Sequence, residues 1–246
     1  MTKNYSVQLY SVRDAVADDL QGAVARLAEI GFENVEPYAF AERTDEYERA
    51  FVASGISAPS GHAAVIDSDE PDRIFDAAAR LGIGTVIDPL IPAERWQSVD
   101  DIARTAARVN ELAARAATFG LGFGYHNHAW EIATRIDGRP ALHAFVDRLD
   151  AGVRLEIDTY WATIGGADAP ELLRGLAERV GFIHVKDGPI SDDVTTQLPA
   201  GQGAVDVAGV LAAAPQALRV VEFDSYSGDV FAGIAASLAW LAENDS

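Results

Sequence analysis

Residues 153–184 read VRLEIDTYWATIGGADAPELLRGLAERVGFIH, and this stretch predicts the fold. A short apolar run at 153–158 is followed by a helical pattern over 170–179 and by a second apolar run at 182–184. A strand, a helix and a second strand within about 30 residues form the βαβ unit of parallel sheets. Each apolar run ends on a polar residue, Asp158 in the first and His184 in the second.

The same pattern recurs along the whole chain. The predicted strands are 6–10, 34–37, 56–62, 85–88, 121–126, 153–158, 182–184 and 218–222. The helices predicted to follow them are 18–30, 44–53, 71–81, 99–119, 140–149, 170–179, 207–214 and 231–241. Eight such units with right-handed crossovers predict an α/β fold, a single (β/α)8 TIM barrel spanning 1–246 as one catalytic domain. An open doubly wound sheet is the alternative, but no Gly-x-Gly-x-x-Gly turn follows the first strand.

Composition excludes several classes of protein. The 246 residues contain no Cys, which excludes disulfide scaffolds, thiolate nucleophiles and thiolate metal sites. No apolar run is long enough to span a membrane, and the start, residues 1–6, lacks the apolar stretch of a secretion signal. A net charge of −19 disfavours nucleic-acid partners. We therefore expect a cytoplasmic protein that acts on a small molecule, and the sequence leaves a homo-oligomer open.

Polar residues crowd the carboxyl ends of the predicted strands, where barrel enzymes hold their chemistry. They are Gln8, Tyr10, Glu36, His62, Asp88, His126, His128, Glu156, Asp158, His184, Lys186, Glu222 and Asp224. Alternation along a strand places residues two apart on one side. His126, Asp158, His184 and Glu222 are then expected to converge from four consecutive strands, whereas Glu156 lies one step deeper.

Two imidazoles and two carboxylates predict a site for one divalent metal. This mixed set suits Mn²⁺, Zn²⁺, Co²⁺ or Fe²⁺ better than Mg²⁺ or Ca²⁺. The alternative is that each of these residues is satisfied by local hydrogen bonds or ion pairs. Lys186 could hold an oxyanion, act as an acid or base if burial lowers its pKa, or form a salt bridge with Asp187 or Glu222.

Five short motifs resemble the sugar phosphate isomerase/epimerase family, which belongs to the xylose isomerase-like barrel superfamily. They are Gln8–Arg13, Tyr125–His128, Glu156–Trp161, His184–Gly188 and Gly201–Gly203. The resemblance implies a metal held at strands five to eight by Glu, Asp, His and Glu. Asp158, His184 and Glu222 match the last three positions. His126 stands where many relatives have Glu, and Glu131 is the other candidate on that loop.

The resulting hypothesis is a metal-dependent isomerase or epimerase of a sugar or keto-sugar, acting through a metal-stabilised enediolate. Glu222, Lys186, His128 and His62 are the expected acid, base or oxyanion groups. Residues expected to contact the substrate are Tyr10, Arg13, Glu131 and Trp161. Few basic residues lie near the strand ends, so an unphosphorylated substrate is expected. The alternatives are a dehydratase of a keto-inositol or keto-sugar and a barrel that binds sugar without catalysis, while the charge disfavours a DNA-repair nuclease.

Overall fold

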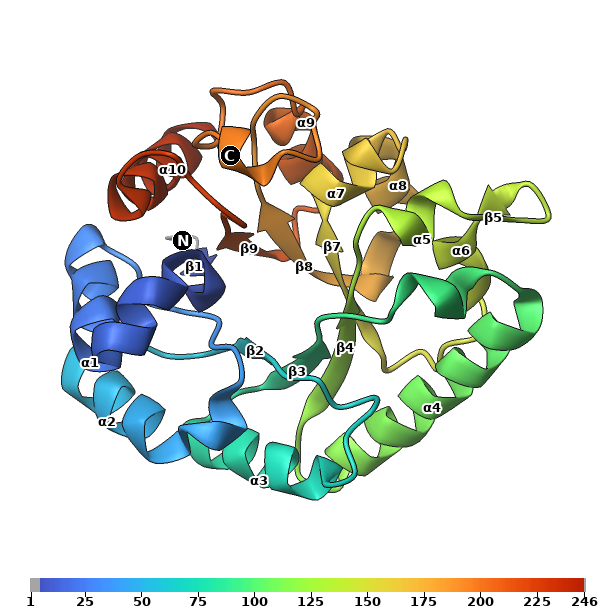
Figure 1. Ribbon diagram of the computed structural model, residues 1–246, viewed down its shortest axis with the longest axis horizontal. Coiled ribbons are helices and arrows are strands. Elements are labelled where there is room, and N and C mark those ends of the chain that lie inside the picture. The colour runs from blue at the N-terminus through green and yellow to red at the C-terminus, as the bar shows by residue number, and fades with distance from the viewer. Residues whose placement is uncertain (1–4, 246) are drawn as a thin grey trace.

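A curled parallel sheet forms the centre of the computed structural model, which describes residues 5–245 (Figure 1). Its seven strands run in the order β1-β9-β8-β7-β4-β3-β2. Their bounds are β1 Tyr5–Val7, β2 Ser60–His62, β3 Thr85–Asp88, β4 Gly122–His126, β7 Arg154–Asp158, β8 Val180–Val185 and β9 Leu218–Val221. Residues 1–4, on which part of the expectation about a secretion signal rests, lie outside the described residues.

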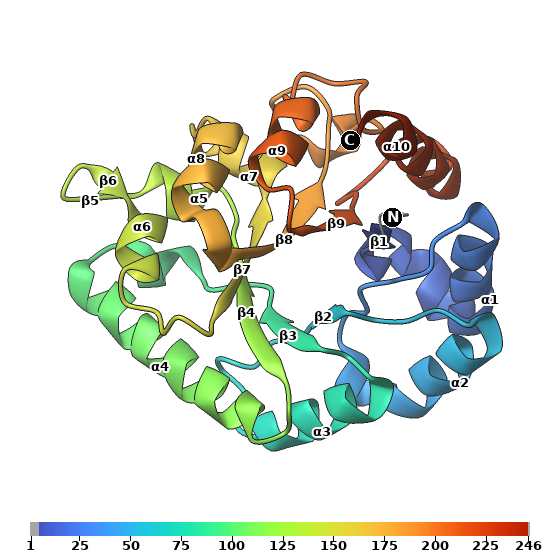
Figure 2. The ribbon, with the colours of Figure 1, turned by 180° about the vertical axis from the view of Figure 1, so that it is seen from behind.

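Helices surround the sheet, as the views from the two sides show (Figures 1 and 2). The longer ones are α1 Arg13–Ile30, α2 Thr44–Ser54, α3 Pro71–Leu81, α4 Val99–Ala117, α8 Ala169–Leu176 and α10 Val230–Asn244. The shorter ones are α5 Trp130–Ala133, α6 Ala141–Val146, α7 Thr159–Ile164 and α9 Val207–Ala213. No helix among residues 5–245 has the length and apolar character needed to cross a membrane.

The predicted second strand, 34–37, differs from expectation. Residues 34–38 join their neighbours only through isolated parallel bridges, with Glu36 opposite Gln8 and Tyr38 opposite His62. Pro37 has no N–H to donate, which interrupts a regular ladder. The segment still hydrogen-bonds to β1, through Glu36 N–H to the Val7 carbonyl, and to His62 in β2. The parallel α/β architecture is confirmed, but the count of eight strands is not.

Most helices follow the predicted positions, with shifted ends. α3 matches the prediction at both ends, since Pro71 begins it and Gly82, at a φ of 72°, ends it. α6 covers only 141–146 of the predicted 140–149. The predictions missed α5, α7 and a small hairpin made of β5 Arg135–Ile136 and β6 Arg139–Pro140. Two of these additions, α5 and α7, follow the carboxyl ends of β4 and β7.

Register places the polar strand ends at successive levels of the same end of the sheet. His126 of β4 pairs with Glu156 of β7, and Asp158 of β7 pairs with His184 of β8. Val185 of β8 pairs with Val221 of β9, so Glu222 directly follows the paired region. Beneath these residues and around the sheet, buried aliphatic and aromatic side chains form the hydrophobic core. The sheet therefore gathers its histidines and carboxylates at one end, whereas Arg154 of β7 and Arg219 of β9 lie toward the other end.

Asp88, at the end of β3, holds two loops at that same end. Its carboxylate accepts hydrogen bonds from the backbone N–H groups of Val65, Ile66 and Leu90, at 2.7, 2.8 and 3.2 Å. Burial raises the pKa of Asp88 to about 6, although these three hydrogen bonds act in the opposite direction. The side chain thus joins the loop after β2 to the loop after β3.

The raised pKa of Asp88 predicts a specific dependence of stability on pH. A carboxyl group whose pKa is higher in the folded state than its unfolded value of about 3.9 stabilises the fold at low pH. That contribution is lost as the pH rises through about 6. We expect the advantage of the wild type over Asp88→Asn, in free energy of unfolding, to fall by up to ~3 kcal/mol between about pH 4 and about pH 7. Urea denaturation of both proteins measures it, and a difference that is constant or grows with pH contradicts the assignment.

Candidate metal and catalytic site

A cluster of buried ionisable side chains occupies the carboxyl end of the sheet. His126 ends β4, Asp158 ends β7, His184 lies in β8 and Glu222 directly follows β9. The four side chains that the sequence analysis expected to converge therefore come from consecutive strands of the sheet. His143, the fifth histidine, lies in α6 and takes no part in the cluster.

Ligand atoms of Asp158, His184 and Glu222 lie within 4.8 Å of one another, a spacing that fits a metal ion. The Nε2 atom of His126 lies 3.8 Å from Asp158 Oδ2. Two carboxylates and two imidazoles form a donor set that suits Mn²⁺, Zn²⁺, Co²⁺ or Fe²⁺. His126 and Glu222 also line a cavity, which is the open access that a catalytic metal needs.

Lys186 places an ammonium group among the same carboxylates. Its Nζ atom lies 2.7 Å from Asp158 Oδ2, 2.6 Å from Glu222 Oε2 and 2.9 Å from Asp224 Oδ2. The salt bridge to Glu222 that the sequence analysis allowed is present. Burial alone would lower the pKa of Lys186, but these three carboxylates raise it well above its usual value. The idea of a lysine base with a lowered pKa is therefore wrong, because Lys186 is a fixed cation.

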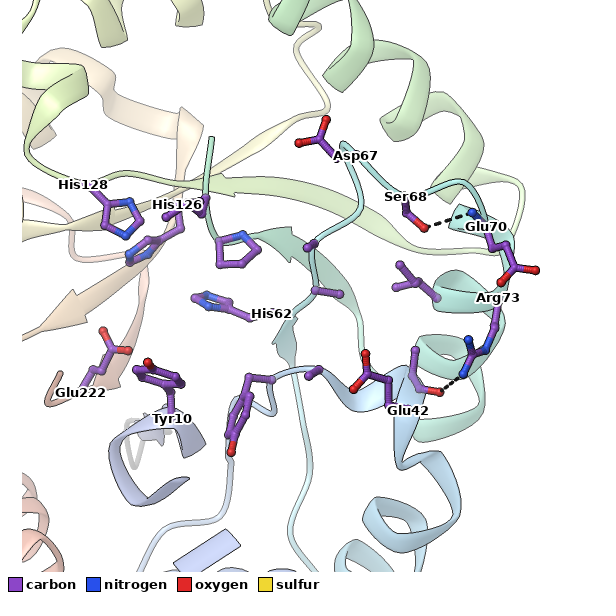
Figure 3. A pocket seen from close by; sticks show the side chains of 18 of the residues that line it. Tyr10, Glu42, His62, Asp67, Ser68, Glu70, Arg73, His126, His128 and Glu222 are labelled. Carbon is purple, nitrogen blue, oxygen red and sulfur yellow. Dashed lines mark hydrogen bonds between the residues drawn. The ribbon is translucent and has the colours of Figure 1, made fainter. Parts of the chain in front are cut away.

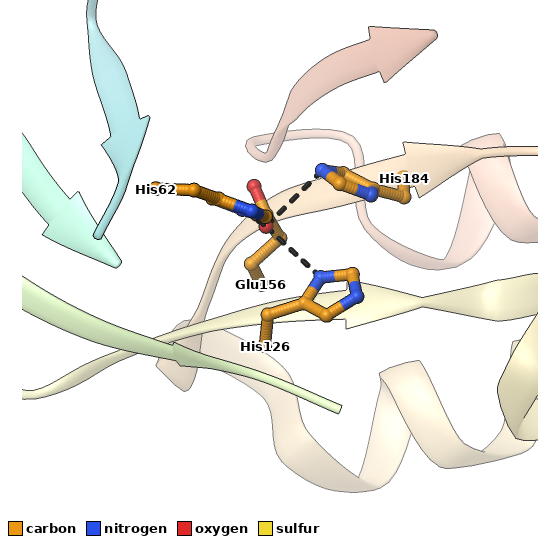
Figure 4. Close-up of side chains that lie close together, drawn as sticks. All are labelled: His62, His126, Glu156 and His184. Carbon is orange, nitrogen blue, oxygen red and sulfur yellow. Dashed lines mark hydrogen bonds and ion pairs between the residues drawn. The ribbon is translucent and has the colours of Figure 1, made fainter. Parts of the chain in front are cut away.

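Glu156 lies beneath these groups and contacts three histidines (Figure 4). Its Oε2 atom is 2.5 Å from His62 Nε2, 3.0 Å from His126 Nδ1 and 3.1 Å from His184 Nε2. Burial acts to raise the pKa of Glu156, but His184 and His62 hold it well below its usual range. One buried carboxylate thus holds the orientation of three imidazole rings.

Glu36 comes from the segment between β1 and β2. Together with Glu156 it forms a layer of carboxylates beneath Asp158 and Glu222, here called the lower layer. Its Oε1 atom accepts hydrogen bonds from Gln8 Nε2 and His184 Nε2, both at 2.9 Å, and Ser60 donates to its Oε2. Burial and the nearby charge of Glu156 raise the pKa of Glu36. For His62, burial acts to lower the pKa, but the charges of Glu36 and Glu156 raise it above the usual value.

The two ring nitrogens of His126 and His184 face different layers. His126 turns Nδ1 to Glu156 and Nε2 toward Asp158. His184 turns Nε2 to Glu36 and Glu156 and Nδ1 to Glu222, at 2.6 Å from Glu222 Oε2. Metal-ligating histidines typically donate their second N–H to a carboxylate, which fixes the tautomer and the ring orientation. This arrangement favours Glu156 and Glu36 as the supporting carboxylates of a metal held above them.

A second group of ligand atoms, from His62, His126, Glu156 and His184, also meets the spacing for a metal. Its carboxylate already lies at hydrogen-bond distance from all three imidazoles. His62 and His126 of this group line the cavity, whereas Glu156 and His184 are fully buried. The group of Asp158, His184 and Glu222, here called the upper group, contains a carboxylate that lines the cavity, Glu222, and is therefore the better candidate for a site that substrate can reach.

A cavity of about 780 Å³ opens above the cluster (Figure 3). Of the residues expected to contact substrate, Tyr10 and Trp161 line it. Arg13 instead packs over the Tyr10 ring, 4.5 Å from its centroid, and donates hydrogen bonds to the carbonyls of Tyr10 and Asp224. Glu131 is buried, where it accepts hydrogen bonds from the Tyr125 hydroxyl and the His128 backbone N–H. Arg13 and Glu131 thus support this wall of the cavity without lining it.

His128 is a neutral group on the cavity wall. Its ring stacks on Trp130, with centroids 4.4 Å apart and planes 5° apart. Burial and the nearby charge of Lys186 lower the pKa of His128 to about 4. Burial raises the pKa of Glu131, which fixes the His128 backbone, to about 7. At neutral pH His128 therefore presents an uncharged imidazole to the cavity.

Sequence reasoning missed several contributors to the site. Asp224 and Glu36 were named among the polar residues at strand ends, but no role was predicted for them. Their partners lie on strands that are distant in the sequence. Gln197 gave no signal, although its side chain hydrogen-bonds both the carboxylate and the backbone N–H of Asp224, at 2.7 and 2.8 Å. Gln197 belongs to the segment 188–203 after β8, and the Asp187 carboxylate accepts hydrogen bonds from the backbone N–H groups of Gly188 and Gly203 in this segment.

Comparison with known proteins agrees with this architecture. A family model described as a xylose isomerase-like TIM barrel matches residues 24–243. The chain belongs to this family. Among curated proteins, none matches the sequence.

Solved structures share the fold at low sequence identity. A sugar phosphate isomerase/epimerase from Parabacteroides distasonis has a TM-score of 0.83 and 21% identity, over 98% of this chain and 94% of that chain. The IOLI protein with a bound zinc atom has a TM-score of 0.75 and 15% identity, over 99% and 98%. A probable 3-DHS dehydratase, AsbF from Bacillus anthracis, has a TM-score of 0.75 and 12% identity, over 99% and 100%.

The role assigned to Glu156 predicts a loss of metal affinity in Glu156→Gln. Removing the charge that orients His126 and His184 should weaken binding of Mn²⁺ or Zn²⁺ by ~10–100-fold. Calorimetric titration of the metal-free protein measures this, and Glu243→Gln, an exposed residue near the end of α10, is the matched control. Unchanged affinity in a folded Glu156→Gln variant would refute the supporting role.

Proposed function

We propose that this chain is a divalent-metal-dependent isomerase or epimerase of an uncharged sugar or keto-sugar. The observation that carries the proposal is the grouping of Asp158, His184 and Glu222 at metal-ligand spacing beneath an open cavity. His126 Nε2 lies 3.8 Å from Asp158 Oδ2, and the buried Lys186 ammonium lies beside the carboxylates. The structural neighbour named as a sugar phosphate isomerase/epimerase supports the reaction class.

His126, Asp158, His184 and Glu222 are the proposed metal ligands. When bound there, a divalent ion supplies Lewis-acid polarisation of a carbonyl and of the hydroxyl next to it. The neighbour with a bound zinc atom supports a metal in this fold. Glu36 and Glu156 hold one nitrogen of each imidazole, so that His126 Nε2 faces Asp158 and His184 Nδ1 faces Glu222.

Glu222 is the proposed base. Burial acts to raise its pKa, but Lys186 and His184 hold it well below the usual range, so the side chain is a carboxylate at neutral pH. It takes the proton from the carbon next to the carbonyl, and the C–H electron pair becomes the enediolate. The proton then returns to the other carbon in isomerisation, or to the other face of the same carbon in epimerisation.

Lys186 and His128 have complementary proposed roles. The Lys186 ammonium, fixed by Asp158, Glu222 and Asp224, stabilises negative charge that develops on a substrate oxygen. His128, neutral and on the cavity wall, donates a hydrogen bond to a substrate hydroxyl and can relay a proton. His62 lies lower, between Glu36 and Glu156, and acts by holding those carboxylates.

A dehydratase is the second candidate function, and the neighbour named as a probable dehydratase favours it. The first step is the same proton removal by Glu222. In dehydration the enediolate then expels a hydroxyl from the β-carbon, and water leaves with the proton. The product tells the two apart, because dehydration forms a conjugated carbonyl that absorbs in the near ultraviolet, whereas isomerisation conserves mass.

Hydrogen exchange in deuterated water tests the proposed function. Mn²⁺-loaded protein should place deuterium next to the carbonyl of at least one sugar in a panel of ketoses, keto-sugars and inososes. Glu222→Gln should lower the exchange rate by ~10²–10⁴-fold, because it removes the base, and chelation of the metal should lower it likewise. Glu243→Gln should leave the rate unchanged.

Mass spectrometry of the recovered sugars provides the readout. The absence of exchange with every sugar in the panel, in metal-loaded wild type, would contradict the proposed function.

A further inference from the structure

The cavity extends well beyond the metal candidates. Its volume of about 780 Å³ lies in the upper part of the ~300–1,000 Å³ range of pockets for drug-sized ligands. The histidines, Glu222 and Tyr10 lie at one side, and Glu42, Asp67 and Arg73 lie at the other (Figure 3). A single sugar ring placed against Glu222 and His126 would therefore leave the second half empty.

The part of the cavity on the side of Glu42, Asp67 and Arg73 is here called the arm. The apolar and aromatic residues that line the cavity include Tyr38, Ala41, Ala63, Ala64, Ile74 and Leu90. Leu90 is 49% exposed and Tyr10 is 43% exposed, so two of the exposed large hydrophobic residues described lie on the wall of one cavity. Exposed apolar side chains gathered in a concave site indicate a ligand surface.

Buried hydrogen bonds hold the arm in shape. Asp88 binds the backbone of Val65, Ile66 and Leu90. The indole N–H groups of Trp96 and Trp130 both donate to the Ile91 carbonyl, at 3.2 and 3.1 Å. The loops on both sides of the arm are thus fixed without ligand, which reduces the entropy cost of binding.

The charge at the far end of the arm disfavours anions. Three carboxylates, Glu42, Asp67 and Glu70, line it with one cation, Arg73. Arg73 donates a hydrogen bond to the Ala41 carbonyl, and Asp67 pairs with Arg95 at 2.7 Å. A phosphate or carboxylate on the ligand would meet a net negative wall.

Tyr10 links the two halves of the cavity. Its ring meets Tyr38 edge to face, with centroids 5.5 Å apart and planes at 86°. Tyr10 and Glu222 both line the cavity (Figure 3). A molecule that joins a sugar ring to a flat apolar group could contact both aromatic rings at once.

From these observations we propose that the arm binds an uncharged apolar aglycone, so that the substrate is a glycoside of a keto-sugar rather than a free or phosphorylated monosaccharide. The ring ketone of such a glycoside supplies the carbonyl that the proposed reaction needs. This inference rests on the proposed function for the sugar half of the cavity. It assigns specificity to the segment before β2 and to the loops after β2 and β3, which carry none of the four proposed metal ligands.

Binding of matched glycosides to the Mn²⁺-loaded protein tests the inference. The probes are the methyl, phenyl and 4-carboxyphenyl β-glycosides of D-glucose, D-galactose and D-xylose, measured by calorimetry. For at least one sugar, the phenyl glycoside should bind at least ~10-fold more tightly than the methyl glycoside, since burying an aromatic ring gains more than the ~1.4 kcal/mol that tenfold requires. The 4-carboxyphenyl glycoside should bind several-fold more weakly than the phenyl one, because Glu42, Asp67 and Glu70 repel it.

Two variants test whether the preference for phenyl glycosides arises in the arm. Ala64→Trp fills the arm and should abolish the preference for phenyl over methyl glycosides. Leu90→Ser removes part of the apolar wall without filling it and should reduce the preference. Ala151→Trp, in the exposed turn before β7, is the control and should leave it intact.

The inference is overturned if no phenyl glycoside binds better than its methyl partner, or if the preference survives both Ala64→Trp and Leu90→Ser. Deuterium exchange with free keto-sugars tests the proposed function separately. Deuterium exchange without a preference for phenyl glycosides refutes only the aglycone-binding role of the arm. A preference for phenyl glycosides without any deuterium exchange refutes only the proposed reaction.

Discussion

Charge pairing inside the sheet is the constraint on which the rest of the site depends. Four carboxylates, Glu36, Glu156, Asp158 and Glu222, are buried together at the strand ends. An unpaired buried charge costs several kcal/mol, so such a group is tolerated only with partners of opposite charge and good geometry. His62, His184 and Lys186 supply that charge, each in contact with at least two of the four carboxylates.

The charge pairs form two layers with different roles. One layer orients the imidazole rings, and the other forms the candidate metal site. The lower layer, built on Glu36 and Glu156, holds imidazole rings by one nitrogen each. The upper layer is built on Asp158 and Glu222, of which Glu222 lines the cavity, and both carboxylates contact the Lys186 ammonium. Loss of a lower carboxylate therefore acts on the upper site through ring orientation, with no direct contact to the substrate. Burial raises the pKa of Asp158 to about 6, although the charge of Lys186 acts in the opposite direction. The charge of Asp158 is therefore the least compensated one in the upper layer.

Much of this site could be predicted from the sequence, because parallel strands repeat every two residues and end at one edge. His126, Asp158, His184 and Glu222 were placed together on that basis, and the structure brings them together. The sign of the pKa shift of Lys186 could not be predicted, since it depends on Asp158 and Asp224, which the chain brings in from other strands. The irregular segment around Pro37 and the contribution of Gln197 depend on tertiary contacts that leave no local pattern.

The direct measurement of the central claim is the position of a bound metal. Anomalous diffraction from crystals of the Mn²⁺-loaded protein locates the ion without reference to activity. The account predicts one peak ligated by His126 Nε2, Asp158, His184 Nδ1 and Glu222, with Glu156 still hydrogen-bonded to the opposite nitrogens of both rings. A peak between His62, His126, Glu156 and His184, or no peak at the strand ends, would contradict it.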